Sequence, residues 1–202
     1  RLLRSSATRA RAPVEPCPVA GPGVVDEGPP FRLSAGRLEH GVEAFGWRLK
    51  EPDGRRMIPE KLAVLGIAGP DIGRLQRSGS IEAGGRRVSI EQVSEVRPGQ
   101  SFAFVMDTRI CDAAFELAAG VDMLVCESTF LSEEAALAEQ YGHLTAAHAA
   151  TIARDAGARL LVLTHFSQRY PDTAPLLEEA QSLFPNTVAA ADLVTIPVPP
   201  RH

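Results

Sequence analysis

Four polar side chains occupy comparable positions in this sequence, each at the end of a predicted strand or in the loop after one. They are His40, Asp107, His143 and His165. In layered α/β folds, ligands and reacting groups collect at strand ends and in the loops that follow them. Asp107 and His165, which end the apolar runs SFAFVM and RLLVLT, are expected at the same edge of one sheet. If His40 also reaches that edge, the three form a nitrogen and oxygen ligand set that suits zinc.

Each of these side chains also has a simpler interpretation. A lone histidine at the end of a strand is more often a capped surface residue than a metal ligand. Asp107 is equally suited to be an N-cap for the helical segment that follows Cys111. The spacing alone leaves both interpretations open.

The elements that must position these residues follow from hydrophobic periodicity. After Pro98, apolar strands alternate with helices, which predicts an α/β fold with adjacent strands joined by crossovers. Strands are expected at 101–106, 122–128 and 159–164, helices at 112–119, 132–140, 145–156 and 174–183, and a strand-like stretch at 187–198. Residues 31–49 alternate like two strands joined at His40 and Gly41, whereas residues 1–30 show no sustained periodicity.

Residues 51–98 differ in character from the sequence on either side. They contain Gly, Pro, one short helical stretch near 59–65 and a concentration of basic residues. These are Arg55, Arg56, Lys61, Arg74, Arg77, Arg86 and Arg87. We therefore predict core at 1–50, an inserted arm at 51–98 and core again at 99–202, with a solvated insertion that binds nothing as the alternative for the arm.

Composition narrows the class of protein. The 202 residues are 45% hydrophobic and 23% charged, which is ordinary for a soluble single domain. A net charge of −4 gives no global basic field, although a local basic patch is sufficient for nucleic acid. The three cysteines form neither a CxxC pair nor a disulfide framework, which favours a reducing cytoplasm. No apolar run approaches the ~20 residues of a membrane span, so no membrane association is expected.

Five short runs occur in the order HGVEAFGWR (40–48), MDTR (106–109), CESTF (126–130), YGHLT (141–145) and LTHFSQRY (163–170). Together they resemble the ribonuclease Z family along nearly the whole chain. The first resembles the family's H-G-V-x-A-x-G-Y-R segment, the last its T-H-x-S-x-R-Y motif, and VAAAD (188–192) its closing strand. The resemblance implies a metallo-β-lactamase fold, an αββα sandwich. It also implies a zinc-dependent endoribonuclease that removes the 3′ trailer from tRNA precursors and leaves a tRNA 3′-hydroxyl and a trailer 5′-phosphate.

The resemblance also implies roles for single residues at the catalytic edge. His40 corresponds to a ligand of one zinc, Asp107 to the aspartate that bridges two zincs, and His165 to a ligand of the second. His143 corresponds to the family's catalytic-helper histidine. Glu127 matches the glutamate of an H-E-A-T-like turn and is expected to orient His143.

For the substrate, the resemblance implies that the arm, including GIAGP (66–70), grips the tRNA elbow away from the active site. The residues expected to bind substrate are Gly69, Pro70, Arg74 and Arg77 in the arm, and Ser167 and Arg169 in the last motif. A phosphate contact is expected for Ser167 and Arg169, because arginine suits planar oxyanions. The family also suggests a homodimer in which the arm of one subunit serves the site of the other.

Some features depart from the family's pattern. Met106 replaces a glycine, Cys126 a histidine and Leu144 a serine or threonine, and the H-x-H-x-D-H motif has no counterpart here. We therefore expect this chain to be the carboxyl-terminal part of a longer enzyme, with the amino-terminal part of the fold missing. Residues 1–202 alone leave each zinc two protein ligands, so they are expected to bind zinc poorly and to be inactive.

Two other functions stay open on the sequence. One is a metallo-β-lactamase-fold hydrolase of small phosphodiesters or sulfate esters, which would not need the arm. The other is an inactive, degenerate half-domain that serves as an interaction module. The joint presence of His40, Asp107, His143 and His165 argues against the second.

Overall fold

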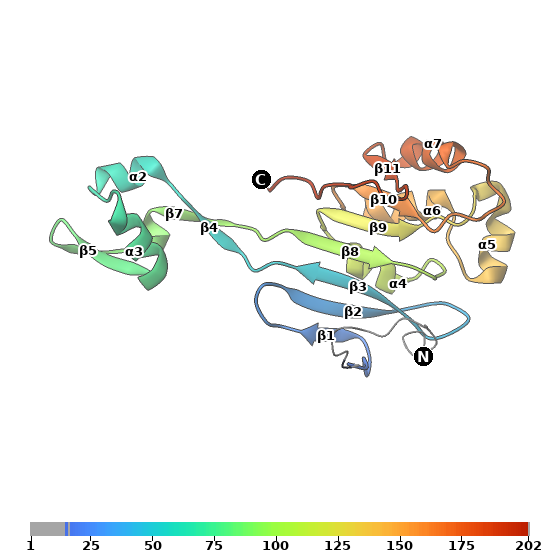
Figure 1. Ribbon diagram of the computed structural model, residues 1–202, viewed down its shortest axis with the longest axis horizontal. Helices are drawn as coiled ribbons and strands as arrows, with labels where there is room; N and C mark the ends of the chain where they lie inside the picture. The colour runs from blue at the N-terminus through green and yellow to red at the C-terminus, as the bar shows by residue number, and fades with distance from the viewer. Residues whose placement is uncertain (1–14, 16, 202) are drawn as a thin grey trace.

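A seven-stranded mixed sheet forms the body of the protein, and an arm extends from the ends of two of its central strands (Figure 1). The computed structural model describes residue 15 and residues 17–201. The strand order is β1-β2-β3-β8-β9-β10-β11. Their bounds are β1 Gly23–Asp26, β2 Arg32–Leu38, β3 Ala44–Lys50, β8 Ser101–Val105, β9 Met123–Glu127, β10 Leu161–Thr164 and β11 Thr187–Ala189. Strand β1 lies within the stretch for which the sequence predicted no element.

The sheet is antiparallel from β1 to β8 and parallel from β8 to β11. Helices cross over between the parallel strands, which confirms the predicted α/β class. They are α4 Asp112–Ala118, α5 Ala135–Tyr141, α6 Ala146–Asp155 and α7 Ala174–Leu183. None of the helices in the described part of the chain is long and apolar enough to span a membrane.

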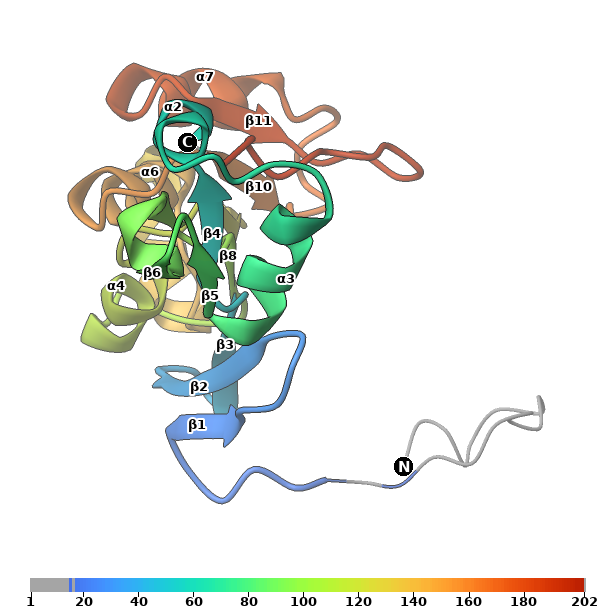
Figure 2. The ribbon, with the colours of Figure 1, turned by 90° about the vertical axis from the view of Figure 1, so that its left-hand side faces the viewer.

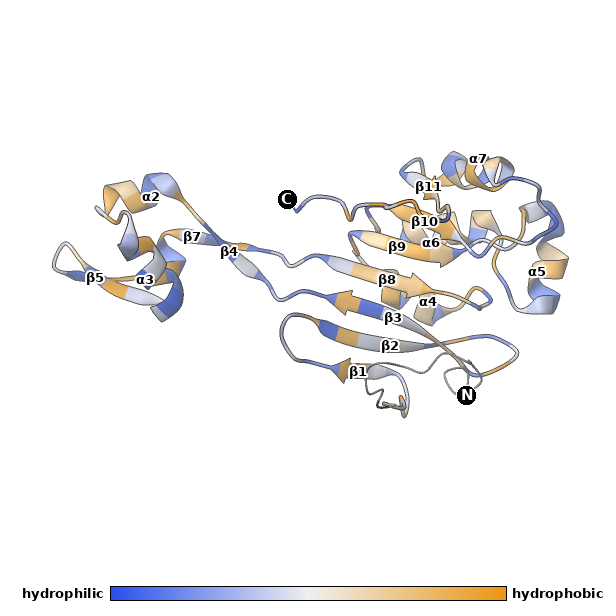
Figure 3. Ribbon diagram, viewed as in Figure 1, coloured by the Kyte–Doolittle hydropathy of each residue, from blue (hydrophilic) through white to orange (hydrophobic). Residues whose placement is uncertain are grey.

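One face of the sheet packs against α4, α6 and α7, and α4 and α6 lie to one side of the strands in Figure 2. Inward-facing residues of β8, β9 and β10 supply this core, and these strands are among the more hydrophobic elements in Figure 3. Leu124 and Leu163 from the strands and Ile152 and Leu176 from the helices are fully buried. The apolar runs predicted as strands therefore fix the ends at which Asp107 and His165 lie.

The second face of the sheet has no covering helix among the described residues. Trp47 pairs with Phe104, and Phe104 with Val125, so their side chains share this face. Phe104 is 38% exposed. The segment after β11 packs against part of this face, through Ile196 and Val198.

That segment corrects one prediction. Of the strand-like stretch 187–198, only Thr187–Ala189 pairs with β10, and the rest is extended without a ladder. Pro197 has no N–H to donate to a neighbouring strand. Farther on, Gln100 Nε2 donates a hydrogen bond to the carbonyl oxygen of Pro199 over 2.7 Å, and Arg201 forms an ion pair with Glu51.

The arm, defined here as residues 54–97, is an antiparallel stalk that carries a small head. The stalk pairs β4 Gly54–Met57 with β7 Ser94–Arg97, and the head contains α2 Pro59–Val64, α3 Pro70–Ser78 and the hairpin of β5 Ser80–Ala83 and β6 Arg86–Ser89. The sequence predicted only the first helix. The head has its own hydrophobic cluster, formed by Leu62, Ile67, Leu75, Val88 and Val93.

Because this cluster is separate from the sheet's core, truncating its centre should loosen the head alone. Leu75 is completely buried. Leu75→Ala is expected to cost the head about 2–5 kcal/mol. Hydrogen exchange should quicken across residues 57–94 and stay unchanged in β8–β10. Equal acceleration in both regions would show that head and sheet unfold as one unit.

Candidate functional site

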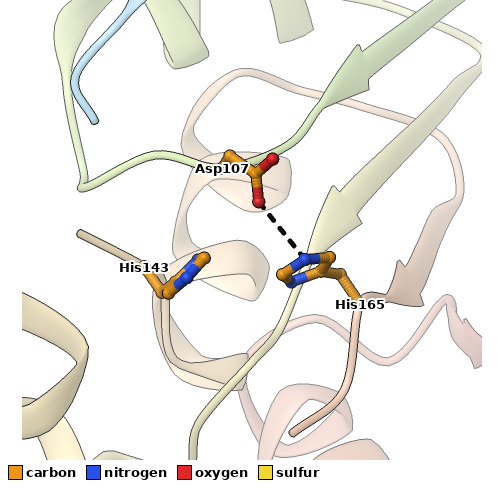
Figure 4. A group of neighbouring side chains, drawn as sticks. All are labelled: Asp107, His143 and His165. Atoms are coloured by element: carbon orange, nitrogen blue, oxygen red, sulfur yellow. Dashed lines mark ion pairs between the residues drawn. The ribbon is translucent and has the colours of Figure 1, made fainter. Parts of the chain in front are cut away.

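The carboxyl ends of the parallel strands bring three predicted site residues together. Asp107 lies two residues after β8, His165 directly after β10, and His143 in the loop between α5 and α6. One potential ligand atom from each lies within 4.8 Å of the others. His165 Nε2 is 3.2 Å from Asp107 Oδ1, and both point toward the space beside His143 (Figure 4).

Two of these residues hold the backbone in the left-handed region. Asp107 has φ of 53° and His165 has φ of 57°. For a residue with a β-carbon this conformation costs roughly 1–2 kcal/mol, and such strain is typical of functional sites. At His165 the neighbouring chain holds this conformation, because Ser128 N–H donates to Thr164 O (2.9 Å) and Ser167 N–H to Thr129 O (3.2 Å). Beside Asp107, Thr108 N–H donates to Glu127 (2.7 Å).

The buried carboxylate of Glu127, the last residue of β9, organises the site. It is fully buried and accepts hydrogen bonds from the backbone N–H groups of Thr108 (2.7 Å) and Leu144 (3.0 Å). The Thr129 hydroxyl donates to it over 2.6 Å, and His143 Nδ1 lies 3.1 Å away. Glu127 therefore ties the segments that carry Asp107 and His143 to the end of β9.

His40 lies beside the cluster but is not one of its three members. Its Nδ1 is 2.9 Å from the carbonyl oxygen of Gly142, and its ring centroid is 5.2 Å from that of His143. The turn before β3 reaches the site because Glu39 N–H donates to Thr108 Oγ1 (3.1 Å) and Arg109 N–H donates to Glu39 O (2.7 Å).

The donor set fits a metal ion. Each of the three histidines engages Nδ1 in a hydrogen-bonding contact: His40 with Gly142 O, His143 with Glu127 and His165 with Thr129. Nε2 is then left for another partner, the arrangement usual for metal-binding histidines. Imidazole nitrogens and a carboxylate oxygen suit zinc.

The departures from the family's pattern leave this geometry in place. Burial raises the pKa of the Cys126 thiol well above its ordinary value, with Glu127 and Cys111 as lesser causes. Cys126 is therefore a neutral core thiol rather than a ligand. Leu144 is fully buried and serves Glu127 through its backbone N–H.

The last predicted motif lies next to the cluster with its arginine already paired. Arg169 Nη1 is 2.6 Å from Glu134 Oε1, and its guanidinium lies 5.4 Å from the centroid of the Phe130 ring. Phe130 is in turn 6.3 Å from His143, measured between ring centroids. Ser167 is half-buried in the same loop.

The remaining predicted residues lie on the arm, away from the sheet edge that holds the cluster. Gly69 is the N-cap of α3 and Pro70 its first residue. Arg74 and Arg77 follow on the exposed surface of α3, where Arg74 pairs with Asp71 over 2.5 Å. The arm leaves the opposite edge of the sheet (Figure 1).

Sequence reasoning did not identify Thr108 and Thr129 as part of the site. Thr108 accepts from Glu39 and donates its N–H to Glu127, while Thr129 contacts both Glu127 and His165. Both lie within the runs MDTR and CESTF. The available signal was thus their position in the loop that follows a strand, close in sequence to an acidic residue.

Gly142 offers a test of how His40 is held. Its φ is 78°, and a β-carbon there would lie 2.9 Å from His40 Nδ1. Gly142→Ala is expected to lower the free energy of unfolding by roughly 1–2 kcal/mol through backbone strain. It should also push the His40 ring aside, which shifted His40 ring resonances in NMR spectra would show.

Gly157→Ala is the matched control, since its φ is 69° and nothing lies within 4 Å of a β-carbon there. It should cost a similar free energy and leave the His40 resonances unmoved. If both variants shift those resonances equally, the contact between Gly142 and His40 does not hold the ring.

The chain is similar in sequence to known proteins. The pattern of a Beta-lactamase superfamily domain matches residues 84–166. The chain is 56% identical over its full length to Ribonuclease Z of Nocardia farcinica and covers 67% of that protein. It is 54% identical to Ribonuclease Z of Streptomyces avermitilis and covers 66% of it. The chain thus spans about two thirds of the length of these curated relatives.

Two solved structures share the fold. The metallo-beta-lactamase fold protein YhfI from Bacillus subtilis aligns with a TM-score of 0.54 at 18% identity, over 83% of this chain and 49% of its own. The short form of human tRNase Z aligns with a TM-score of 0.53 at 22% identity, over 87% of this chain and 46% of its own. The expectation of a metallo-β-lactamase fold is therefore confirmed.

Proposed function

The chain belongs to the ribonuclease Z family of nucleases, and on that premise we propose that the protein is a zinc-dependent endoribonuclease that removes the 3′ trailer from tRNA precursors. The observation that carries the proposal is the cluster of Asp107, His143 and His165 at the carboxyl ends of parallel strands. In layered α/β folds this is the usual place for a catalytic site.

In this proposal Asp107 and His165 would hold zinc, with His40 as a further ligand. Zinc bound there would supply a Lewis acid that lowers the pKa of an attacking water to about 7 and offsets charge on the phosphoryl oxygens. These protein donors number fewer than the three or four that each zinc needs. The remaining donors must therefore come from outside the described residues.

His143 then delivers a proton. Glu127 holds its Nδ1, so Nε2 is the nitrogen available to the site. In its doubly protonated form His143 keeps one proton on Nδ1, toward Glu127, and can pass the other from Nε2 to the 3′-oxygen that departs from phosphorus. The products are a tRNA 3′-hydroxyl and a trailer 5′-phosphate, and the ring returns to its neutral form. Proton transfer of this kind typically contributes ~10²–10⁴-fold.

The arm is proposed to bind the body of the substrate. Gly69, Pro70, Arg74 and Arg77 are exposed on its head, where phosphate contacts would position a folded RNA without reading its sequence. Arm and cluster lie at opposite edges of the sheet (Figure 1). A homodimer, with the arm of one chain near the cluster of another, would bring the two together.

We propose that the protein works in the reducing cytoplasm, which the three free cysteines support.

The geometric cluster contains His143, whereas the proposal makes His40 the ligand and His143 the proton donor. Metal analysis of full-length variants separates these roles. His143→Ala is expected to keep its zinc and lose cleavage by about 10²–10⁴-fold. His40→Ala and Asp107→Ala should lose bound zinc together with cleavage.

His148→Ala is the control for these histidine variants, because His148 is half-buried in α6 near its N-cap and lies outside the cluster. It should keep both zinc and cleavage. Loss of zinc from His143→Ala with retention in His40→Ala would exchange the two roles.

The arm distinguishes tRNA processing from hydrolysis of small phosphodiesters. Residues 54–97 can be replaced by a short linker, since Gly54 and Arg97 are paired at the base of the stalk. Cleavage of precursor tRNA should then fall by about 10²-fold or more, because several phosphate contacts are lost together. Hydrolysis of a small chromogenic phosphodiester should persist. Equal loss of both activities would instead assign the arm a folding role.

Point substitutions on the arm test the same role with less risk of misfolding than its deletion. Arg74→Ala combined with Arg77→Ala should raise KM for the precursor most strongly at low salt. Arg154→Ala is the matched control, because Arg154 is also exposed and also pairs with an aspartate, Asp155, but lies on α6. Its KM should stay unchanged.

A further inference from the structure

The hydroxyl of Thr129 lies between the Glu127 carboxylate and the His165 ring. Its Oγ1 lies 2.6 Å from Glu127 Oε2 on one side and 2.9 Å from His165 Nδ1 on the other. A third neighbour, the carbonyl oxygen of His165, is 3.0 Å away. Thr129 is 7% exposed, so water competes little for these contacts.

A hydroxyl has one proton, and the geometry decides where it goes. The carboxylate is the nearest neighbour, at the distance of a charge-assisted O–H···O⁻ bond. Donation to His165 instead would leave Glu127 Oε2 without its shortest hydrogen bond in a fully buried position, which is costly. Thr129 therefore donates to Glu127.

With its proton committed, Oγ1 can only accept from the histidine. The contact at 2.9 Å then requires a proton on His165 Nδ1, which leaves the lone pair on Nε2. Nε2 is the atom that lies 3.2 Å from Asp107 Oδ1, on the side of the cluster. Glu127 orients the His143 ring without an intervening hydroxyl, because His143 Nδ1 faces the carboxylate directly.

From this arrangement we propose that Thr129 is a positioning residue that links Glu127 to His165, so that one buried carboxylate sets the ring orientation and tautomer of both histidines. The inference deepens the proposed function and rests on the zinc site assigned there. It gives the threonine a role in metal binding, although Thr129 itself touches neither metal nor substrate.

The test is the zinc affinity of the full-length protein, measured by competition with a chelating dye. Thr129→Val removes the hydroxyl and keeps the branched shape. It should weaken zinc binding about 10–100-fold, the usual effect of losing an outer hydrogen-bonding partner. Thr129→Ser keeps the hydroxyl and should bind zinc within about threefold of the wild type.

The serine variant and the melting of metal-free protein together exclude a packing explanation. If only the methyl group mattered, Thr129→Ser would bind zinc as weakly as Thr129→Val. That result, or unchanged affinity in Thr129→Val, would overturn the inference. The metal-free variants are expected to melt at similar temperatures. If the melting temperature fell only in Thr129→Val, by an amount that accounts for its weaker zinc binding, the inference would also be overturned.

A double-mutant cycle shows whether the threonine acts through the carboxylate. In a Glu127→Gln background, Thr129→Val should change zinc affinity by no more than about threefold, because coupled sites are not additive. A full 10–100-fold effect in that background would mean that Thr129 acts on His165 alone.

Cleavage of precursor tRNA by the same zinc-loaded samples distinguishes failure of the Thr129 inference from failure of the nuclease assignment. If the wild type cleaves but Thr129→Val binds zinc normally, only the inference fails. If Thr129→Val weakens zinc binding but the zinc-loaded wild type does not cleave, only the nuclease assignment fails.

Discussion

The site depends on one constraint, that a carboxylate buried without water must find donors for its lone pairs. Glu127 meets this requirement with two backbone N–H groups, one hydroxyl and one imidazole. Those donors come from the loops after β8 and β9 and from the loop between α5 and α6. Satisfying the carboxylate therefore closes these loops around one point, and the clustering of Asp107 and His143 follows from it.

The sheet explains why the cluster forms at this edge. Parallel strands β8, β9 and β10 all end on the same side, so Asp107 and His165, both with left-handed backbone, lie close together at the strand ends. The antiparallel half of the sheet carries the arm. Strand β3 runs away from the site, and the arm is inserted between its end and the start of β8. In the proposed function, chemistry and substrate binding therefore lie at opposite ends of one sheet.

Much of this arrangement could be predicted from the sequence, and the exceptions have physical reasons. Runs such as RLLVLT are too apolar to be anything but buried, so the parallel strands and the position of His165 followed directly. The arm was predicted as an insertion, but strand β1 and most of the strands and helices within the arm were not, because these elements are short and rich in polar residues that obscure the hydrophobic period. The contact of Thr129 with His165 joins two loops that are far apart in the sequence, and no local pattern encodes it. The assignment of His40 as a ligand stays a prediction, since its ring lies beside the cluster rather than within it.

The stalk of the arm continues two particular strands. Strand β3 begins a few residues after His40 and leads into β4, and β7 leads into β8, which ends two residues before Asp107. The ion pair of Glu51 with Arg201 and the hydrogen bond from Gln100 to Pro199 O brace the root where the stalk meets the sheet. A pull on the distant head would consequently load β3 and β8 first, and the hydrogen-bonded ladders to β2 and β9 would share that load before it reached the strand ends near His40 and Asp107.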